Sequence, residues 1–318
     1  MTFSLRVADD VAAAIGNAQP VVALETTLVS HGFSAGRGLA AALESQDRVR
    51  AVGAVPATIG VLDGEIRVGL DRAALERFAE AGTAARKVGA RDIAACLVQG
   101  ALGSTTVGGT LAICRKAGIT FMATGGIGGV HRGFAESLDI SADLLQIART
   151  RAVVVCSGAK SILDVPATAE LLETLGVPVL GWQTSTLPLF YAALGGPPVS
   201  AVVTADAEVA AVAAAHWELS PSGGLVLARP PREGLDLAEL IDRAVQRVKA
   251  DGVTGQAVTP AVLTLIEELS DGRSVAVNRA LIVDNAGLAA EVAVAYAANA
   301  GRPVRSAGTG ELRPPSQP

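Results

Sequence analysis

The chain has 318 residues, of which half are hydrophobic and 18% are charged, so it can bury a large core as one large domain or two small ones. With 35 glycines and only 3% aromatic residues, packing must rest on Ala, Val and Leu with close backbone approaches, which favours a layered α/β fold. The net charge of -5 and the lack of a Lys/Arg cluster argue against a nucleic-acid surface. We therefore expect a small-molecule partner.

The three cysteines, Cys96, Cys114 and Cys156, lie in apolar runs without metal-type spacing. They are expected to be small core residues in a reducing compartment. The N-terminus lacks a charged start followed by an apolar signal core, and no apolar run reaches the ~18 residues of a membrane span. A cytoplasmic location is the expectation.

The first informative run is VVALE at residues 21–25, which predicts a short buried strand ending at Glu25. A loop and a helix through AALESQDRVRA follow. Ligands of open α/β sheets bind at the carboxyl ends of the strands, so an acid at this position is a candidate functional residue. Alternatively, Glu25 caps the next helix or pairs with an arginine.

The next segments alternate in type. PATIGVLDGEIRVGL has alternating apolar positions around Asp63-Gly64, which predicts a hairpin. DRAALERFAEAG has a helical period, and ARKVGARDIAACLVQG is expected to carry Lys87 and Arg91 into another buried strand. STTVGGTLAICRKAG predicts a Ser/Thr-rich helix start, where exposed backbone N–H groups favour an anion.

A glycine cluster, GGIGGVHRG, surrounds His131 and Arg132. Converging backbone amides and these two side chains suit a phosphate. The cluster matches neither a phosphate-binding P-loop nor a dinucleotide fingerprint, and glycines can equally serve close packing. Lys87 is a second possible phosphate partner, unless it is simply a solvated lysine.

In LDISAD, Asp139, Ser141 and Asp143 occupy alternate positions. In an extended segment all three side chains would lie on one side and suit a hard cation such as Mg²⁺ or Mn²⁺. The alternative is that Ser141 or Asp143 caps the helix predicted for ADLLQIA.

AVVVC is short and apolar, as expected of a central strand, and SGAKSIL predicts the turn into the next helix. Lys160 lies in that turn. Burial lowers the pKa of a lysine by up to ~3–5 units, which would make Lys160 a nucleophile. Alternatively, its stem packs on the sheet while its ammonium group reaches water.

The second half continues the alternation. The runs VPVLGWQT and GGLVLARP predict strands. Residues 184–204 are expected to form a flap or an edge strand, and the segments after Leu235 are expected to form helices. Asn278 and Asn285 lie seven apart on one helix face, so both can face a pocket or bridge helices. Repeated strand-helix-strand units predict a mostly parallel sheet covered on both faces, in one domain over residues 1–300. Residues 301–318 lack periodicity and are expected to form a disordered tail.

Between Val21 and Ala300 the chain resembles the pseudouridine-5′-phosphate glycosidase family. The resemblance rests on ALETTLVSHG, PATIGVLDGEIRVGL, KVGARD, TVGGT, ATGGIGGVHRG through DISADL, VCSGAKSILD, GVPVLGWQT, VTP and NRALIVDNA, in this order. It implies a three-layer α/β/α subunit with a mixed, mostly parallel sheet, assembled as a homotrimer. The implied reaction is reversible cleavage of the C–C glycosidic bond of pseudouridine 5′-phosphate to uracil and ribose 5-phosphate. The resemblance also implies a divalent metal, usually Mn²⁺.

The resemblance also implies roles for individual residues. Lys160 matches the lysine that forms an imine with C1′ of the ring-opened sugar, an electron sink that lets the C1′–C5 bond break. A C-glycoside has no leaving heteroatom to protonate, so two flanking carboxylates would not suffice. Glu25 matches the acid/base residue and Asp139 the metal ligand. Substrate contacts match Lys87, Val107, Thr124, His131, Ser141, Ala142, Asp143 and Asn285, with Asn278 as the second choice of asparagine.

Several positions depart from the family pattern. The loop after His31 reads GFSAGRG where GMPYPQN is usual, Asp284 replaces the first asparagine of a pair, LPLFY replaces FPAFY, and an arginine near Val203 is missing. These changes concern the uracil contacts. The alternative functions are a lyase that forms a lysine imine with another sugar phosphate, and a non-catalytic sugar-phosphate sensor.

Overall fold

The structure, a computed structural model, describes residues 4–33, 37–253 and 258–299. The expected tail at 301–318 lies outside these residues. The central sheet has 11 strands: β1 (Leu5–Val7), β2 (Val21–Glu25), β3 (Val55–Leu62), β4 (Glu65–Val68), β5 (Arg86–Val88), β6 (Gly103–Thr105), β7 (Phe121–Ala123), β9 (Val153–Cys156), β11 (Val179–Trp182), β12 (Ala201–Val203) and β13 (Leu225–Ala228).

The strand order is β1-β4-β3-β2-β7-β9-β13-β11-β12, with β6 pairing β3 and β5 pairing β6. All pairings are parallel except β3 with β4 and β3 with β6. A separate antiparallel pair joins β8 (Val130–His131) to β10 (Leu163–Asp164). The predicted mixed, mostly parallel sheet is confirmed, and β12 is the edge strand expected within residues 184–204.

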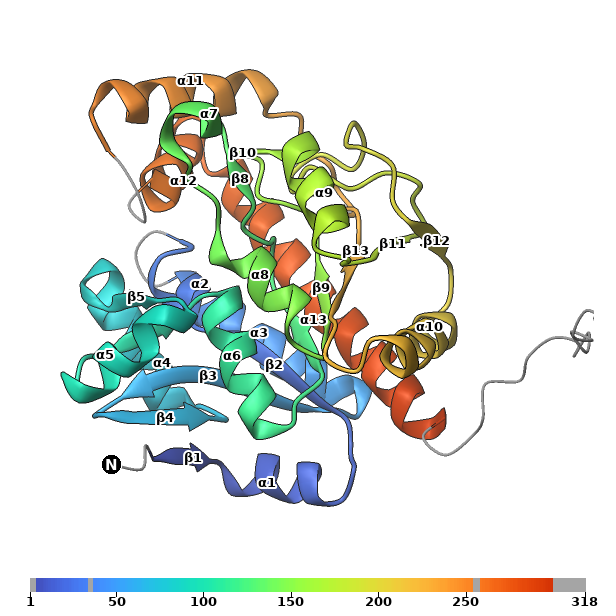
Figure 1. The fold of residues 1–318 in the computed structure, drawn as a ribbon. Helices are drawn as coiled ribbons and strands as arrows, with labels where there is room; N and C mark the ends of the chain where they lie inside the picture. Colours follow the sequence, from blue (N-terminus) through green and yellow to red (C-terminus); the bar gives the residue numbers. More distant parts are fainter. Residues whose placement is uncertain (1–3, 34–36, 254–257, 300–318) are drawn as a thin grey trace, which may run out of the picture.

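Helices cover both faces of the sheet (Figure 1). They are α1 (Asp9–Gly16), α2 (Thr27–Ser30), α3 (Arg37–Val52), α4 (Arg72–Ala81), α5 (Ile93–Val98), α6 (Val107–Ala117), α7 (Phe134–Ser137), α8 (Ala142–Ala148), α9 (Val165–Thr174), α10 (Asp206–Leu219), α11 (Ala238–Ala250), α12 (Val258–Leu269) and α13 (Arg273–Asn299). The three-layer α/β/α arrangement is therefore present.

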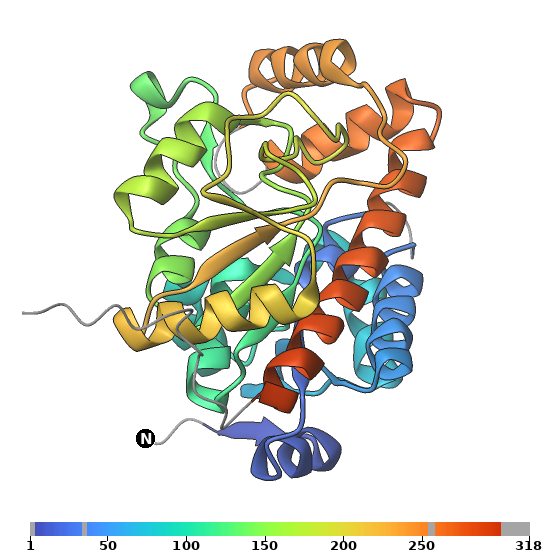
Figure 2. The same ribbon diagram turned by 90° about the vertical axis from the view of Figure 1, so that its right-hand side faces the viewer.

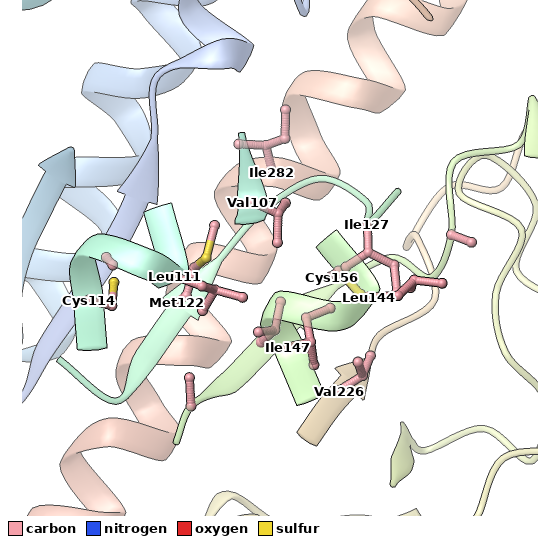
Figure 3. Packing of buried hydrophobic residues seen from close by; sticks show 14 of the residues in the cluster. Val107, Leu111, Cys114, Met122, Ile127, Leu144, Ile147, Cys156, Val226 and Ile282 are labelled. Carbon is pink, nitrogen blue, oxygen red and sulfur yellow. The ribbon is translucent and has the colours of Figure 1, made fainter. Parts of the chain in front are cut away.

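Strand β9 illustrates why its sequence is continuously apolar. Val154 and Cys156 belong to the core cluster on the α6 and α8 side, shown in Figure 3. Val153 and Val155 belong to a second cluster, which includes residues of α10 and α13. A strand of a doubly covered sheet must be hydrophobic on both faces. The prediction that AVVVC is a central strand is confirmed, since β9 lies between β7 and β13.

Helix α13 runs across one face of the sheet between α3 and α10 (Figure 2). By length and composition it could cross a membrane, but 56% of its apolar window is buried inside the protein. Packing against strands and two helices accounts for its hydrophobicity. The three cysteines are free and buried, as predicted, and burial raises the pKa of Cys114 and of Cys156 to about 12.

The hairpin at Asp63-Gly64 is confirmed. Both turn residues have positive φ, 53° and 76°, as a type I′ turn between β3 and β4 requires. The prediction of a buried strand after Arg91 is wrong, because Ile93–Val98 forms helix α5. A short apolar run does not distinguish a strand from a buried helical turn, and its two alanines favour the helix.

Candidate functional site

A cavity of about 340 Å³ opens at the carboxyl end of the central strands. Glu25 ends β2, Thr124 follows β7 and Lys160 follows β9, so the parallel strands bring three distant sequence segments to one edge. Among the residues suggested by the sequence, the lining includes Glu25, Lys87, Thr124, His131, Asp139, Ser141, Ala142, Asp143 and Lys160.

Glu25 is only 5% exposed, and the hydroxyls of Thr27 and Thr124 bond its two carboxylate oxygens. Burial raises the pKa of Glu25, although the positive charge of Lys160 and the two hydroxyls act in the opposite direction. Glu25 neither caps α2, whose N-cap is Thr26, nor pairs with a described arginine. Burial therefore favours the neutral form of this carboxyl group more than in an exposed glutamate, as a general acid requires.

The Thr27 hydroxyl lies 3.0 Å from the backbone oxygen of Thr105, which can only accept a hydrogen bond. Because Thr27 has one hydroxyl hydrogen, it cannot donate to Thr105 and to Glu25 at once. A protonated Glu25 resolves this competition, since it can donate to Thr27 while Thr27 donates to Thr105. The hydrogen-bond pattern thus agrees with the direction of the pKa change.

Lys160 is half-buried and forms no ion pair with any described residue. Its backbone N–H donates to the oxygen of Ile127 at 3.1 Å, which fixes the turn after β9 against the glycine cluster. The turn requires glycine at Gly158, where φ is +84° and a Cβ atom would collide with the backbone oxygen of Pro188. The Lys160 side chain is therefore free to face the cavity from a rigid turn.

Lys87 and His131 share the cavity. Burial, and then the positive charge of Lys160, lower the pKa of Lys87. Burial also lowers the pKa of His131, while Asp139 opposes this change from 3.8 Å, the distance between His131 Nδ1 and Asp139 Oδ2. Arg132, in contrast, pairs with Asp242 on α11 and does not line this cavity.

Asp143 joins two backbone segments. Its Oδ1 accepts from the N–H of Gly108 at 2.7 Å, and its Oδ2 accepts from the N–H of Gly128 at 3.0 Å. Gly108 lies in the first turn of α6, so the anion predicted for that helix start is the Asp143 carboxylate itself. Of the two interpretations of residues 139–143, the helix cap is the one observed: Ser141 is the N-cap of α8 and accepts from the N–H of Asp143 at 3.2 Å, so the segment is not extended throughout.

Within the described residues, no three His, Cys, Asp or Glu side chains gather into a metal-binding group. Asp143 is engaged by backbone amides, whereas the side chain of Asp139 is 37% exposed and lines the cavity. Mg²⁺ and similar ions keep several waters and need only one or two protein carboxylates beside a substrate phosphate. Asp139 alone therefore suits such an ion.

Two suggested residues lie outside the lining. Val107 is fully buried at the start of α6 and belongs to the core cluster of Figure 3. Asn285 is also fully buried, and its Nδ2 donates to the oxygen of Thr124 at 2.9 Å and to Ser157 Oγ at 3.1 Å. Asn278, two turns earlier on α13, does line the cavity.

Part of the cavity wall had no role assigned from the sequence, although most of it lies in quoted motifs. It includes His31, Phe190 of LPLFY, Thr259 and Pro260 of VTP, Leu263, and Ile282 of NRALIVDNA. His31 belongs to a motif noted above, and its place after the strand that ends at Glu25 was the available signal. Burial, and then Lys87, lower the pKa of His31 to about 4. The other five come from distant segments that only the tertiary fold brings to this edge.

The departures from the family pattern lie at different places. Asp284 forms ion pairs with Arg229 at 3.0 Å and Arg232 at 3.1 Å and does not line the cavity. Phe190, in the altered LPLFY segment, does line it. Part of the altered loop after His31, residues 34–36, lies outside the described residues.

The chain is 47% identical to a pseudouridine-5′-phosphate glycosidase of Chloroflexus aurantiacus over 91% of this chain and 98% of that relative. It is 42% identical to the enzyme of the same name from Escherichia coli, over 93% and 97%.

Two solved structures have the same fold. The prealnumycin C-glycosynthase AlnA, in complex with ribulose 5-phosphate, has a TM-score of 0.84 and 39% identity over 94% of this chain and 98% of that chain. An indigoidine synthase A-like protein of Thermotoga maritima has a TM-score of 0.84 and 33% identity, over 93% and 97%. The profile of the family "Indigoidine synthase A like protein" matches residues 10–295. The chain therefore belongs to the indigoidine synthase A-like family, together with the pseudouridine-5′-phosphate glycosidases.

Proposed function

We propose that this protein is a pseudouridine-5′-phosphate glycosidase, which reversibly cleaves the C–C glycosidic bond to give uracil and ribose 5-phosphate. The names of the curated relatives support this substrate. The observation that carries the proposal is that Glu25, a buried carboxyl with a raised pKa, shares one cavity with Lys160, an amine that has no ion-pair partner among the described residues.

The bond changes can be assigned to these two groups. The Lys160 nitrogen forms a bond to C1′ as the C1′–O4′ bond breaks, and Glu25 gives its proton to O4′. Glu25, now a carboxylate, takes a proton from the cationic nitrogen and so restores its lone pair. This lone pair then forms a C1′=N iminium while the C1′–C5 bond breaks, and Glu25 gives the proton to uracil C5. Water hydrolyses the iminium, which releases ribose 5-phosphate and restores the free amine.

The remaining predicted residues suit the sugar phosphate. Lys87 and His131 supply donors for the phosphate at the charged side of the cavity. Thr124 borders the same part of the cavity, with its hydroxyl bonded to Glu25. Asp139 would hold the divalent ion, Mn²⁺ by analogy. When bound, that ion supplies a positive charge for phosphate or hydroxyl oxygens.

The assembly and location proposed with this function are a homotrimer in the cytoplasm. Exposed apolar side chains on and around α7, namely Phe134, Leu138, Ile140 and Leu145, support an association surface. The names of the relatives, including that of the Escherichia coli protein, support a metabolic role.

The test is incubation with ribose 5-phosphate and sodium borohydride, followed by mass spectrometry. A reduced adduct on Lys160 is expected in the wild type and not in Lys160→Ala. Uracil release from pseudouridine 5′-phosphate, measured by chromatography with and without Mn²⁺, tests the overall reaction. An active wild type without an adduct would contradict the imine mechanism.

The alternative functions predict different results. A lyase for another sugar phosphate would turn over other pentose phosphates faster than pseudouridine 5′-phosphate. A sensor would bind ribose 5-phosphate without uracil release. The likeness to a C-glycosynthase favours a further comparison, in which aromatic acceptors other than uracil are offered together with ribose 5-phosphate.

A further inference from the structure

The backbone at Phe190 has a rare conformation. Its φ is +66°, in the left-handed region, and across it the N–H of Tyr191 donates to the oxygen of Leu189 at 2.8 Å. Together these features define a γ-turn with positive φ, a strained form that a bulky aromatic residue seldom adopts. Strain of this kind persists only where the surrounding contacts enforce it, and it occurs mostly at functional sites.

Contacts on several sides enforce this turn. The N–H of Phe190 donates to the oxygen of Ser157 at 3.0 Å, and the N–H of Leu189 donates to the oxygen of Ala192 at 2.9 Å. The Phe190 ring is buried and lies against Gly126, where an added Cβ atom would be 2.6 Å from Phe190 Cδ2. The ring also borders the cavity. Both the backbone and the side chain of Phe190 are therefore fixed.

These contacts reach the turn that carries Lys160. That turn and the loop of the glycine cluster are joined by three backbone hydrogen bonds of 2.8–3.1 Å, from Ser157 N–H to Gly125 O, from Ile127 N–H to Gly158 O and from Lys160 N–H to Ile127 O. Phe190 is bonded to the lysine turn through its N–H and packs on the glycine loop with its ring. It therefore ties together the two segments whose bonds set the position of the lysine backbone.

We infer that Phe190 is a positioning residue for Lys160, and that its strained turn holds the ring on the glycine loop so that the amine keeps the geometry that imine formation requires. This inference rests on the proposed function, in which Lys160 is the nucleophile. A reacting group displaced by about 1 Å can lose about 10²-fold in rate, so a small relaxation of the lysine turn is enough to be measured.

The first test compares Phe190→Ala with Phe190→Gly by thermal unfolding. Both variants remove the ring, but only glycine adopts a positive φ without strain. Phe190→Gly is therefore expected to have the higher Tm, the reverse of the usual order, in which alanine is more stable because it lowers the entropy of the unfolded chain. A higher Tm for Phe190→Ala would show that the turn is not strained and would contradict the inference.

The second test measures how fast ribose 5-phosphate and borohydride form the adduct on Lys160. In Phe190→Leu the rate at saturating ribose 5-phosphate is expected to fall about tenfold or more, while the concentration that gives half the maximal rate stays within about twofold. Phe121→Leu is the matched control, because Phe121 on β7 is equally buried, at 4% exposed, and lies outside the described lining of the cavity. It should lose stability and keep its adduct rate within about twofold.

The outcomes separate this inference from the proposed function. Equal losses of adduct rate in Phe190→Leu and Phe121→Leu would show that Phe190 only stabilises the fold. Weaker binding of ribose 5-phosphate at an unchanged maximal rate would make Phe190 a substrate contact. Either result overturns the positioning role and leaves the proposed function intact. A wild type that forms no adduct contradicts the proposed imine mechanism and the inference with it.

Discussion

The acid chemistry of the site depends on how Glu25 is held. Its carboxyl group lies at the end of a buried strand, between the hydroxyls of Thr27 and Thr124. The Thr27 hydroxyl is also within hydrogen-bond distance of the backbone oxygen of Thr105. Residue identity alone suggests an ordinary carboxylate. Burial reverses that expectation by making the neutral form more favourable.

Glu25→Gln is expected to fold and to lose about 10²- to 10⁴-fold in turnover, the usual contribution of a general acid or base. The amide keeps the size of the side chain and can still bond to Thr27 and Thr124, but it cannot transfer a proton. Steady-state uracil release measures the loss. A variant that keeps more than a tenth of wild-type turnover would assign the proton transfer to another group.

Glu25 also gives stability a pH dependence. Its pKa is raised in the folded protein, so the folded state binds this proton more tightly than the unfolded state. The contribution of Glu25 to the free energy of unfolding is therefore complete below its unfolded-state pKa of 4.5. It is lost as the pH rises through the pKa of Glu25 in the folded protein. Denaturant unfolding from about pH 5 to 8 should show the wild type losing stability relative to Glu25→Gln. A constant difference between the two proteins would contradict the raised pKa.

At the level of elements, the glycine cluster and the starts of α6 and α8 are joined by the Asp143 carboxylate. Asp143→Ala leaves two backbone N–H groups without an acceptor, at a cost of about 1–3 kcal/mol for each buried donor. Asp143→Asn keeps one carbonyl oxygen and should cost less. Urea unfolding measures both variants, and equal stability of Asp143→Ala and the wild type would rule out this bracing role.

Gly128, whose N–H donates to Asp143, packs closely against the start of α8. A Cβ atom at this position would collide with Ser141 and lie 2.8 Å from Asp143 Oδ2. Gly128→Ala is therefore expected to destabilise the protein by about 1–3 kcal/mol, the usual cost of overpacking. Gly16→Ala, where no atom lies within 4 Å of the added carbon, is the matched control and should be nearly neutral. Equal Tm values for the two variants would contradict the close packing.

For the whole molecule, the proposed trimer makes a simple prediction. Light scattering should give three times the chain mass of 32.0 kDa. Leu138→Asp changes a side chain that is 74% exposed in the single chain, so it should weaken association without unfolding the subunit. A monomeric wild type, or a variant as fully trimeric as the wild type, would show that this surface is not the interface.

The sequence by itself determined the strands around the site, because strands buried on both faces must be continuously apolar, as in VVALE and AVVVC. It also determined the hairpin at Asp63-Gly64, whose turn residues adopt positive φ. Local pattern was insufficient for Ile93–Val98, and for residues 139–143 it left an extended segment and a helix cap as alternatives. Helical propensity and a serine cap decided those two segments.

Only the tertiary structure decided which polar groups face the cavity. Asn278 and Asn285 share a helix face and could not be separated by periodicity, yet one borders the cavity and the other bonds to the loops after β7 and β9. Asp143 likewise binds backbone amides in place of a cation. The physical reason is that such choices depend on the partners that distant segments supply, and a pattern along the chain contains no record of them.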